Sequence, residues 1–214
     1  IKDLTIKSVT AQNMTDGAAL RLQNLSSLSS CQVSGTFKSL ILEAWDTDIT
    51  LPSGGILNVD TLDISNGNIS KPRFSTTSDE GVTINIVGGT MKRINLTNFT
   101  DINIEKANKL YQLNIVNPEF VKHISINIPD GYDASEIINK QVIQHKFQLY
   151  VNSKAVSTEN TYDLSQFVNL EYVSFTNGFE TEVVFPNKPI NAKPIVLGAS
   201  CFEKNNSITT IKFV

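Results

Sequence analysis

The sequence predicts a mainly β protein in which short strands stack as the successive turns of a solenoid. Residues 82–128 carry the main signal, because an apolar–polar–apolar phrase recurs there at 84–86, 94–96, 102–104, 113–115 and 126–128. Such period-two alternation is typical of half-buried strands. The phrases return at short intervals that leave little room for helices between them. Ile, Val, Thr, Ser and Asn are abundant, a composition that favours strands and turns.

The strands predicted within 1–128 follow a longer repeat of the form h-x-x-h-x-h, in which h is a large apolar residue. Copies begin at residues 1, 17, 37, 59, 81, 99 and 121, with separations of 16 to 22 residues, and those at 17 and 81 have Gly in the first slot. This spacing is close to that of a leucine-rich-repeat solenoid. Copies that begin at 91 and 110 fall midway, which predicts a second strand on the opposite side of each turn. The alternative fold is an antiparallel β-sandwich with strands at intervals of roughly 8–12 residues.

Turn residues separate the predicted strands, as the corners of a solenoid require. These corner signals are Asp16-Gly17, Ser53-Gly54-Gly55, Asn66-Gly67-Asn68, Gly88-Gly89 and Asn117-Pro118. The polar segment 71–80 is expected to form a longer exposed loop.

The repeat breaks after residue 128. Residues 129–131 are a strong turn signal, and Asp133 followed by Glu136 matches a capping box, which predicts a short helix over 136–143. A strand is expected at 146–151. The predicted organisation is therefore an irregular leucine-rich-repeat-like solenoid at 1–128, an insertion or junction with a short helix at 129–163, and further repeats at 164–214.

The last repeat, 197–214, has the pattern Gly198-x-x-x-Phe202, followed six residues later by an apolar strand. Residues 169–175 align with 207–213 slot for slot. This pattern resembles the BspA-like bacterial surface leucine-rich repeat, although Lys204 or Asn205 occupies its usual Cys slot and no Pro closes the final strand. Residues 1–128 show no asparagine ladder at the ninth slot of classical leucine-rich repeats. The resemblance implies an extracellular or surface-anchored binding protein without catalytic residues.

Composition and charge narrow the classes of function. With 40% hydrophobic and 18% charged residues the chain can form a core, and its net charge of −3 argues against nucleic-acid binding. No apolar run is long enough to span a membrane. Since the chain begins at Ile1 rather than Met, an upstream segment is expected to have been removed or left out. Cys31 and Cys201 are too few for a disulfide framework, and in a solenoid they lie too far apart to pair.

Catalytic signals are sparse. His123 and His145 are isolated in the sequence, and His123 occupies a polar slot where we expect an exposed side chain. Aspartates at 46, 48, 60 and 63 could approach one another across neighbouring turns of a solenoid. Two carboxylates roughly 5–9 Å apart are what glycoside hydrolysis needs, so a carbohydrate-active β-helix is one alternative function.

The outward slots of the repeat are mostly polar and could form a binding face. The spacing predicts that Asn85 lies beside Asn103 on one side and Asn95 beside Asn114 on the other, where stacked amides can hydrogen-bond along the axis. Aromatic side chains at the same face would anchor a partner. The candidate ligand-binding residues are Trp45, Asn95, Asn103, Tyr111, Asn114 and Tyr172.

These observations predict a non-enzymatic bacterial surface-binding or adhesion module that recognises a protein or glycan through its outward strand face. No cofactor, metal or nucleic-acid partner is expected, and the location is extracellular or at the cell surface. A second alternative is a structural component of a virion or an appendage, in which the solenoid serves as a spacer.

Overall fold

The protein is mainly β, and its described residues form one 15-stranded sheet, one two-stranded sheet and one three-stranded sheet. The computed structural model describes residues 3–10, 19–23, 30–43, 49–51, 53–65, 73–76, 81–90, 93–105, 110–127, 134–145, 147–157, 161–176, 181–199, 201–202 and 208–214. Pairing in the large sheet is parallel except between β14 and β15. This pairing is not that of an antiparallel β-sandwich.

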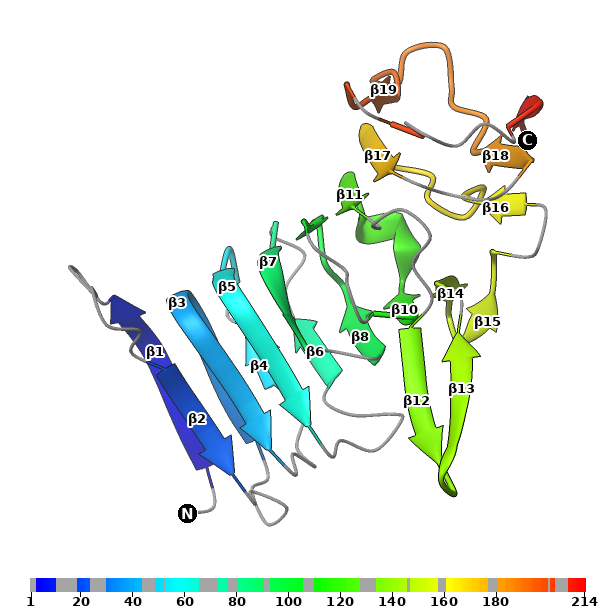
Figure 1. Ribbon diagram of the computed structural model, residues 1–214. Helices are drawn as coiled ribbons and strands as arrows, with labels where there is room; N and C mark the ends of the chain where they lie inside the picture. Colours follow the sequence, from blue (N-terminus) through cyan, green and yellow to red (C-terminus); the bar gives the residue numbers. More distant parts are fainter. Residues whose placement is uncertain are drawn as a thin grey trace.

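The large sheet contains two rows of parallel strands (Figure 1). The long row is β3 (Ser30–Glu43), β5 (Ile56–Ser65), β7 (Thr83–Thr90), β9 (Asp101–Ile104), β11 (His123–Asn127), β17 (Tyr172–Thr176) and β19 (Val196–Leu197). The short row is β4 (Ile49–Leu51), β6 (Arg73–Thr76), β8 (Arg93–Thr97), β10 (Gln112–Val116) and β14 (Gln148–Val151). From β3 to β11 the chain alternates between the rows, so each strand pairs with the strand after next. The predicted copies at 91 and 110 lie in the short row, whereas those at 81, 99 and 121 lie in the long row.

Strand β3 joins the two rows. Cys31 and Gln32 at its start pair with β4, whereas residues 35–43 pair with β5. The change of partner falls near Gly35, whose φ of 117° is open to glycine and strained for other residues. On its other side β3 pairs with β1 (Asp3–Thr10) and β2 (Ala19–Gln23), again in parallel.

The hydrophobic core is a single cluster built from the inward side chains of both rows. Strands β8 and β9 alternate buried and half-buried residues along their length, as expected when one face covers the core. The predicted inward side chains that the structure describes are all exposed by 2% or less, namely Leu40, Leu62, Ile84, Ile94, Ile102, Leu113 and Ile124. Leu42 and Ile64, which were also predicted to face inward, have side chains outside the described set.

The helix predicted over 136–143 is wrong. This segment forms an antiparallel hairpin of β12 (Ala134–Ile138) and β13 (Gln141–His145), which projects away from the large sheet in Figure 1. Asn139 and Lys140 form its two-residue turn with φ of 50° and 66°, the left-handed values of a type I′ turn. The β-branched residues on both sides of this turn favour strands over the helix that a capping box alone suggested.

The chain then returns to the large sheet. The strand predicted over 146–151 is confirmed as β14, which pairs with β10 and turns through Asn152 and Ser153 into β15 (Lys154–Ala155). Beyond it, β16 (Thr161–Asp163), β18 (Glu182–Phe185) and β20 (Thr210–Phe213) form the three-stranded parallel sheet. The slot-for-slot alignment of 169–175 with 207–213 does not correspond to stacking, because β17 pairs with β19 and β20 pairs with β18.

Two predicted corners are confirmed and one is wrong. A turn occurs at Ser53-Gly54, and Asn117 precedes the short 3₁₀ helix η1 (Pro118–Phe120). Gly88-Gly89, by contrast, lies inside β7 and pairs with residues 61 and 62 of β5. The exposed loop predicted over 71–80 is wrong at its centre, because residues 73–76 form strand β6, in which Phe74 and Thr76 are buried. The other predicted corners lie outside the described residues.

The thiol of Cys201 is free, as predicted, but it is half-buried and not fully buried, and this burial raises its pKa. The side chain of Cys31 lies outside the described set. Within the described part of the chain, no helix has the length and apolar character to cross a bilayer.

Candidate functional site

The outward face of the long row carries two columns of side chains in register. The first column crosses β7, β9, β11, β17 and β19 at the start of each strand. It consists of Thr83, Asp101, His123, Tyr172 and Val196. Parallel strands in register place such residues about one strand spacing apart, roughly 4.8 Å, so each can contact its neighbours.

The second column lies two residues further along each strand and is rich in amides and hydroxyls. It consists of Thr36, Asn58, Asn85, Asn103, Ser125 and Ser174. Its first members bond to one another: the Asn85 amide donates to Asn58 Oδ1 at 2.7 Å, and the Asn58 amide donates to Thr36 Oγ1 at 3.2 Å. The predicted placement of Asn85 beside Asn103 is confirmed by the pairing of β7 with β9.

The hydrogen bonds of this column stop at Asn103. Among the described residues, neither the Asn103 amide nor the Ser125 hydroxyl has a hydrogen-bond partner, although both side chains are half-buried. The amide and the hydroxyl lie on adjacent strands, β9 and β11, at paired positions. Hydrogen-bonding groups that are in register and unengaged are the kind that a ligand can use.

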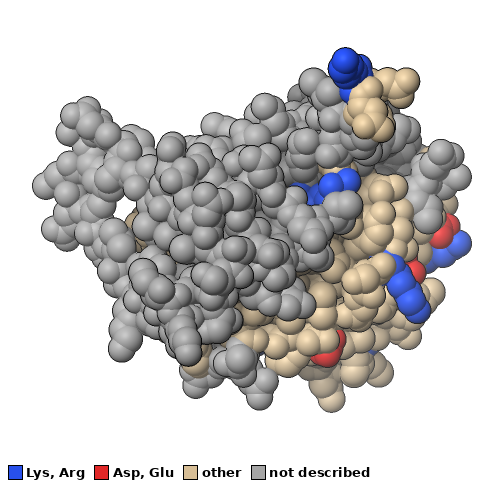
Figure 2. All heavy atoms as spheres, turned by 90° about the horizontal axis from the view of Figure 1, so that it is seen from below, with Lys and Arg blue, Asp and Glu red and all other residues tan. Residues whose placement is uncertain are grey.

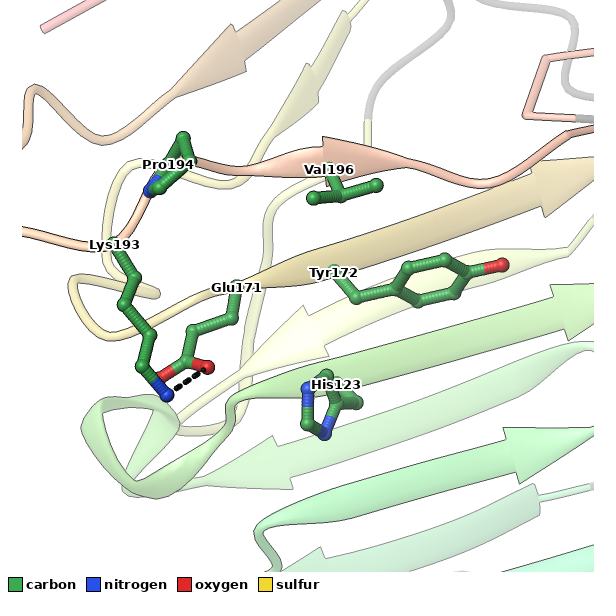
Figure 3. A pocket seen from close by; sticks show the side chains of 6 residues that line it. All are labelled: His123, Glu171, Tyr172, Lys193, Pro194 and Val196. Atoms are coloured by element: carbon green, nitrogen blue, oxygen red, sulfur yellow. Dashed lines mark hydrogen bonds and ion pairs between the residues drawn. The ribbon is translucent and has the colours of Figure 1, made fainter.

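Two shallow hollows open on this face and share His123 and Tyr172. One, of about 320 Å³, lies over the two columns and is lined by Asn85, Asp101, Ile102, Asn103, His123, Ser125 and Tyr172. The other, of about 330 Å³, lies towards β19 and is lined by His123, Glu171, Tyr172, Lys193, Pro194 and Val196 (Figure 3). Since the two hollows adjoin at His123 and Tyr172, these residues mark the centre of the candidate site.

The charged groups around the hollows are arranged in pairs. His123 Nδ1 contacts Asp101 Oδ1, and Lys193 Nζ donates to Glu171 Oε2 at 3.0 Å. The Lys193 hydrogen bond is the main cause that lowers the pKa of the Glu171 carboxyl below its ordinary value, and the nearby charges of Lys193, Lys122 and His123 act in the same direction. The His123 side chain is 47% exposed, as predicted, but the expectation that it stands alone is wrong. Asp101 and His123 each precede the first buried Ile of their strand, a shared slot that could have revealed the pair.

Tyr172 is the aromatic side chain of the site. Its ring lies edge-on to the His123 imidazole, with centroids 6.4 Å apart and an interplanar angle of 62°. In Figure 3 the phenol extends along β17 instead of pointing straight away from the sheet. The predicted role of Tyr172 as an outward anchor is therefore compatible with its position.

The short row uses its predicted site residues differently. Asn114 is only 6% exposed, and its amide donates to Asn95 Oδ1 at 2.9 Å while its oxygen accepts from the Ser153 backbone at 3.0 Å. Stacking of Asn95 on Asn114 was predicted and is confirmed. An exposed anchor at Tyr111 is wrong, because this ring is 4% exposed and lies beneath the Arg93 guanidinium, 4.6 Å from its centroid. Asn95, Asn114 and Tyr111 thus hold the fold together.

A ladder of asparagines that the sequence analysis did not predict lies at the turns after three strands of the short row. Asn98, Asn117 and Asn152 follow β8, β10 and β14 and have left-handed φ of 64°, 59° and 48°. The Asn117 amide donates to Asn98 Oδ1 at 2.6 Å, the Asn98 amide donates to the Thr76 carbonyl at 2.9 Å, and Asn152 Oδ1 accepts from the Asn117 backbone at 3.1 Å. Asn tolerates this conformation better than most residues, so its recurrence just after successive short-row strands was the available signal.

Other sequence candidates fall outside what the structure describes. Trp45 and the aspartates at 46 and 48 lie outside the described residues, as do the side chains at 60 and 63. Within the described residues no group of three or more His, Cys, Asp or Glu side chains is placed to hold a metal ion. Figure 2 shows one face of the molecule, on which the described charged side chains are scattered and carry both signs.

Comparison with known proteins finds no match: no family model, no curated protein and no solved structure is similar to this chain.

Proposed function

We propose that this chain is a solenoid of stacked strand pairs that acts as a non-enzymatic binding module at a cell surface. The partner, a protein or a glycan, lies on the outward face of the long row, over the adjoining hollows at His123 and Tyr172. The observation that carries the proposal is the contrast within one column of amides. Asn85 is bonded to Asn58, whereas Asn103 and Ser125, within the hollow, have no partner among the described residues.

The arrangement of the two rows supports a solenoid. Pairing in register from β5 through β11 and β17 makes this face a continuous surface of parallel strands. Extended faces of this kind are the binding surfaces of solenoid proteins. The resemblance of residues 197–214 to BspA-like repeats adds the expectation of an extracellular or surface location.

Screening the immobilised chain against a glycan array and against extracellular-matrix proteins tests the proposal. A ligand found in either screen is then titrated against Asn103→Ala and Tyr172→Ala. Both substitutions should weaken binding at least about fivefold, because each removes a contact group of a buried interface.

Tyr150→Ala is the matched control, because Tyr150 is a half-buried tyrosine on the short row, bonded to Gln148 at 3.0 Å. It should leave binding unchanged. Binding that depends on Tyr150 but not on Tyr172 would overturn the choice of face. Absence of binding in both screens would count against a binding module.

A further inference from the structure

The phenol of Tyr172 lies across Gly198, the residue that follows β19. A methyl group at Gly198 would come within 2.9 Å of Tyr172 Cζ and within 2.8 Å of Ser174 Cβ, both closer than real Cβ atoms approach other atoms. The end of the ring therefore occupies the space that a side chain at residue 198 would fill. Backbone hydrogen bonds hold Gly198 in place, since its N–H donates to the Val173 carbonyl at 2.8 Å and its carbonyl accepts from Cys201 at 2.9 Å.

This packing fixes how the ring is presented. With Gly198 beneath the phenol and His123 beside it, the ring is held along the sheet and does not stand free in solvent. A glycine covered by an aromatic ring is a known way to order that ring on a sheet surface. The half-buried Tyr172 lines both hollows, so a ligand in either hollow can contact it.

Polar groups surround this ring on the side of the long row. Asn103 offers an amide and Ser125 a hydroxyl, both unengaged among the described residues, and Asp101 and His123 line the same hollow. The phenol of Tyr172 likewise has no hydrogen-bond partner among the described residues. These groups both donate and accept hydrogen bonds over a short span.

From this arrangement we infer that the ligand of the long-row face is a neutral pyranose sugar that stacks on Tyr172. The C–H groups on one face of a pyranose carry partial positive charge and match the negative face of an aromatic ring. The hydroxyls at the edge of the same sugar both donate and accept, as do the Asn103 amide and the Ser125 hydroxyl. This inference rests on the proposed binding function and names its ligand class.

Size and charge favour a neutral sugar over other ligands. The two hollows, of about 330 and 320 Å³, are at the small end of ligand sites, which suits one or two sugar rings and not a large protein anchor. Asp101 contacts His123, and Glu171 is bonded to Lys193. Among the described residues that line the hollows, the basic groups His123 and Lys193 are thus already engaged by carboxylates, which favours a neutral sugar over a sulfated or uronic-acid one.

The test uses the full chain and a panel of free glucose, galactose, mannose, N-acetylglucosamine and glucuronic acid, with saturation-transfer NMR to identify binding. We expect at least one neutral sugar to bind and glucuronic acid to bind more weakly. Tyr172→Ala should weaken the affinity for that sugar about tenfold. Tyr172→Phe keeps the stacking face, so its affinity should stay within about threefold of the unsubstituted chain. Tyr150→Ala is again the control that should change nothing.

Gly198→Ala tests the packing of the ring. It should weaken sugar binding by about the same factor as Tyr172→Ala, and the double variant should bind no more weakly than Tyr172→Ala alone, because both changes act through one ring. A thermal melt of each variant checks that it is folded. If Gly198→Ala is unfolded, the comparison of Tyr172→Phe with Tyr172→Ala still tests whether the ring stacks on the sugar.

Several outcomes overturn the inference. They are failure of every sugar in the panel to bind, binding that Tyr172→Ala does not change, and preference for glucuronic acid. If a matrix protein instead binds in a manner that depends on Asn103 but no sugar does, the proposed binding function stands and the inference about sugars fails.

Discussion

The outward faces of the long and short rows begin from the same sequence phrase and end with different roles. Asn103 and Asn114 both occupy the middle of an apolar–Asn–apolar phrase, on β9 and β10. Asn114 is engaged by Asn95 and by the Ser153 backbone, because the turn between β14 and β15 folds beside it. Asn103 has no such turn among its described neighbours and keeps its amide unengaged. The position in the repeat sets the direction in which the side chain points. Whether a turn lies beside it decides whether its amide is used in the fold or is left available to a ligand.

The two tyrosines near these asparagines differ in the same way. Tyr111 precedes β10 and is buried beneath Arg93, while Tyr172 opens β17 and lies half-buried beside His123. A ring covered by a guanidinium contributes packing and a cation–π contact. A ring that borders a hollow can contact a ligand. Both comparisons favour the long row over the short row as the position of the proposed binding face.

The core should not share this difference, because inward residues of both rows belong to one cluster. Ile102 on the long row and Leu113 on the short row are exposed by 2% and 0%. Ile102→Ala and Leu113→Ala should each cost about 2–5 kcal/mol of unfolding free energy, the range for emptying a core aliphatic site. Chemical denaturation measures both values. A loss below about half a kcal/mol for either variant would show that the inward and outward faces of that row are exchanged.

The inward residues could be predicted from the sequence because burial follows the local period of two. The same period placed Asn85 beside Asn103 and Asn95 beside Asn114. Once strands of equal phase are stacked in parallel, their registers follow from the repeat spacing. The mainly β class and the division of the strands into two alternating sets were predictable for this reason.

Features that depend on contacts outside the repeat were not predictable. Burial of Tyr111 depends on Arg93 from the neighbouring strand, and the orientation of Tyr172 depends on Gly198, which lies 26 residues further along the chain. The hairpin at 134–145 was mistaken for a helix because a capping box is a local signal, whereas strand pairing decides the outcome. Comparison of equivalent slots across turns, as for Asp101 and His123, would have recovered part of the site.

The contrast between the two asparagines can be measured directly. Asn114→Ala leaves the Ser153 N–H and the Asn95 oxygen without a partner and should cost about 1–3 kcal/mol of unfolding free energy. Asn103→Ala removes no bond to a described residue and should change stability by less than about half a kcal/mol. Urea denaturation measures both costs. Each variant is the control for the other, because both replace Asn with Ala. Equal costs would remove the distinction between the two rows.

Substitutions at Asn117, in the asparagine ladder that follows the short-row strands, can separate the effect of backbone conformation from the effect of hydrogen bonding. Asn117→Ala and Asn117→Gly both remove the bond to Asn98, but only alanine is strained at a φ of 59°. The alanine variant should therefore be less stable than the glycine variant by about 1 kcal/mol in chemical denaturation.

The same two substitutions at Asn103 provide the control for the ladder. Asn103 lies in the extended strand β9, where glycine weakens a strand and alanine fits. The order should reverse there, with the alanine variant the more stable. If the alanine variant were the less stable one at both positions, the left-handed backbone conformation would not explain why residue 117 is Asn.

The smallest expected effect concerns the charge pair at the edge of the long-row hollow. The hydrogen bond from Lys193 holds the pKa of the Glu171 carboxyl below its ordinary 4.5, and the nearby charges add to this while desolvation opposes it. Because the folded pKa is depressed, the stabilising contribution is present above the unfolded pKa and is lost as the pH falls through the folded value. Glu171 is half-buried and its partner Lys193 is 75% exposed, so the contribution of this surface pair to stability is too small to follow by unfolding. Carbon-13 NMR of the side-chain carboxyl should instead show a midpoint below 4.5 that moves back towards 4.5 in Lys193→Gln. An unchanged Glu171 midpoint in Lys193→Gln would mean that the pair is not formed in solution, and that the edge of the hollow carries a carboxylate free to bind a cationic group.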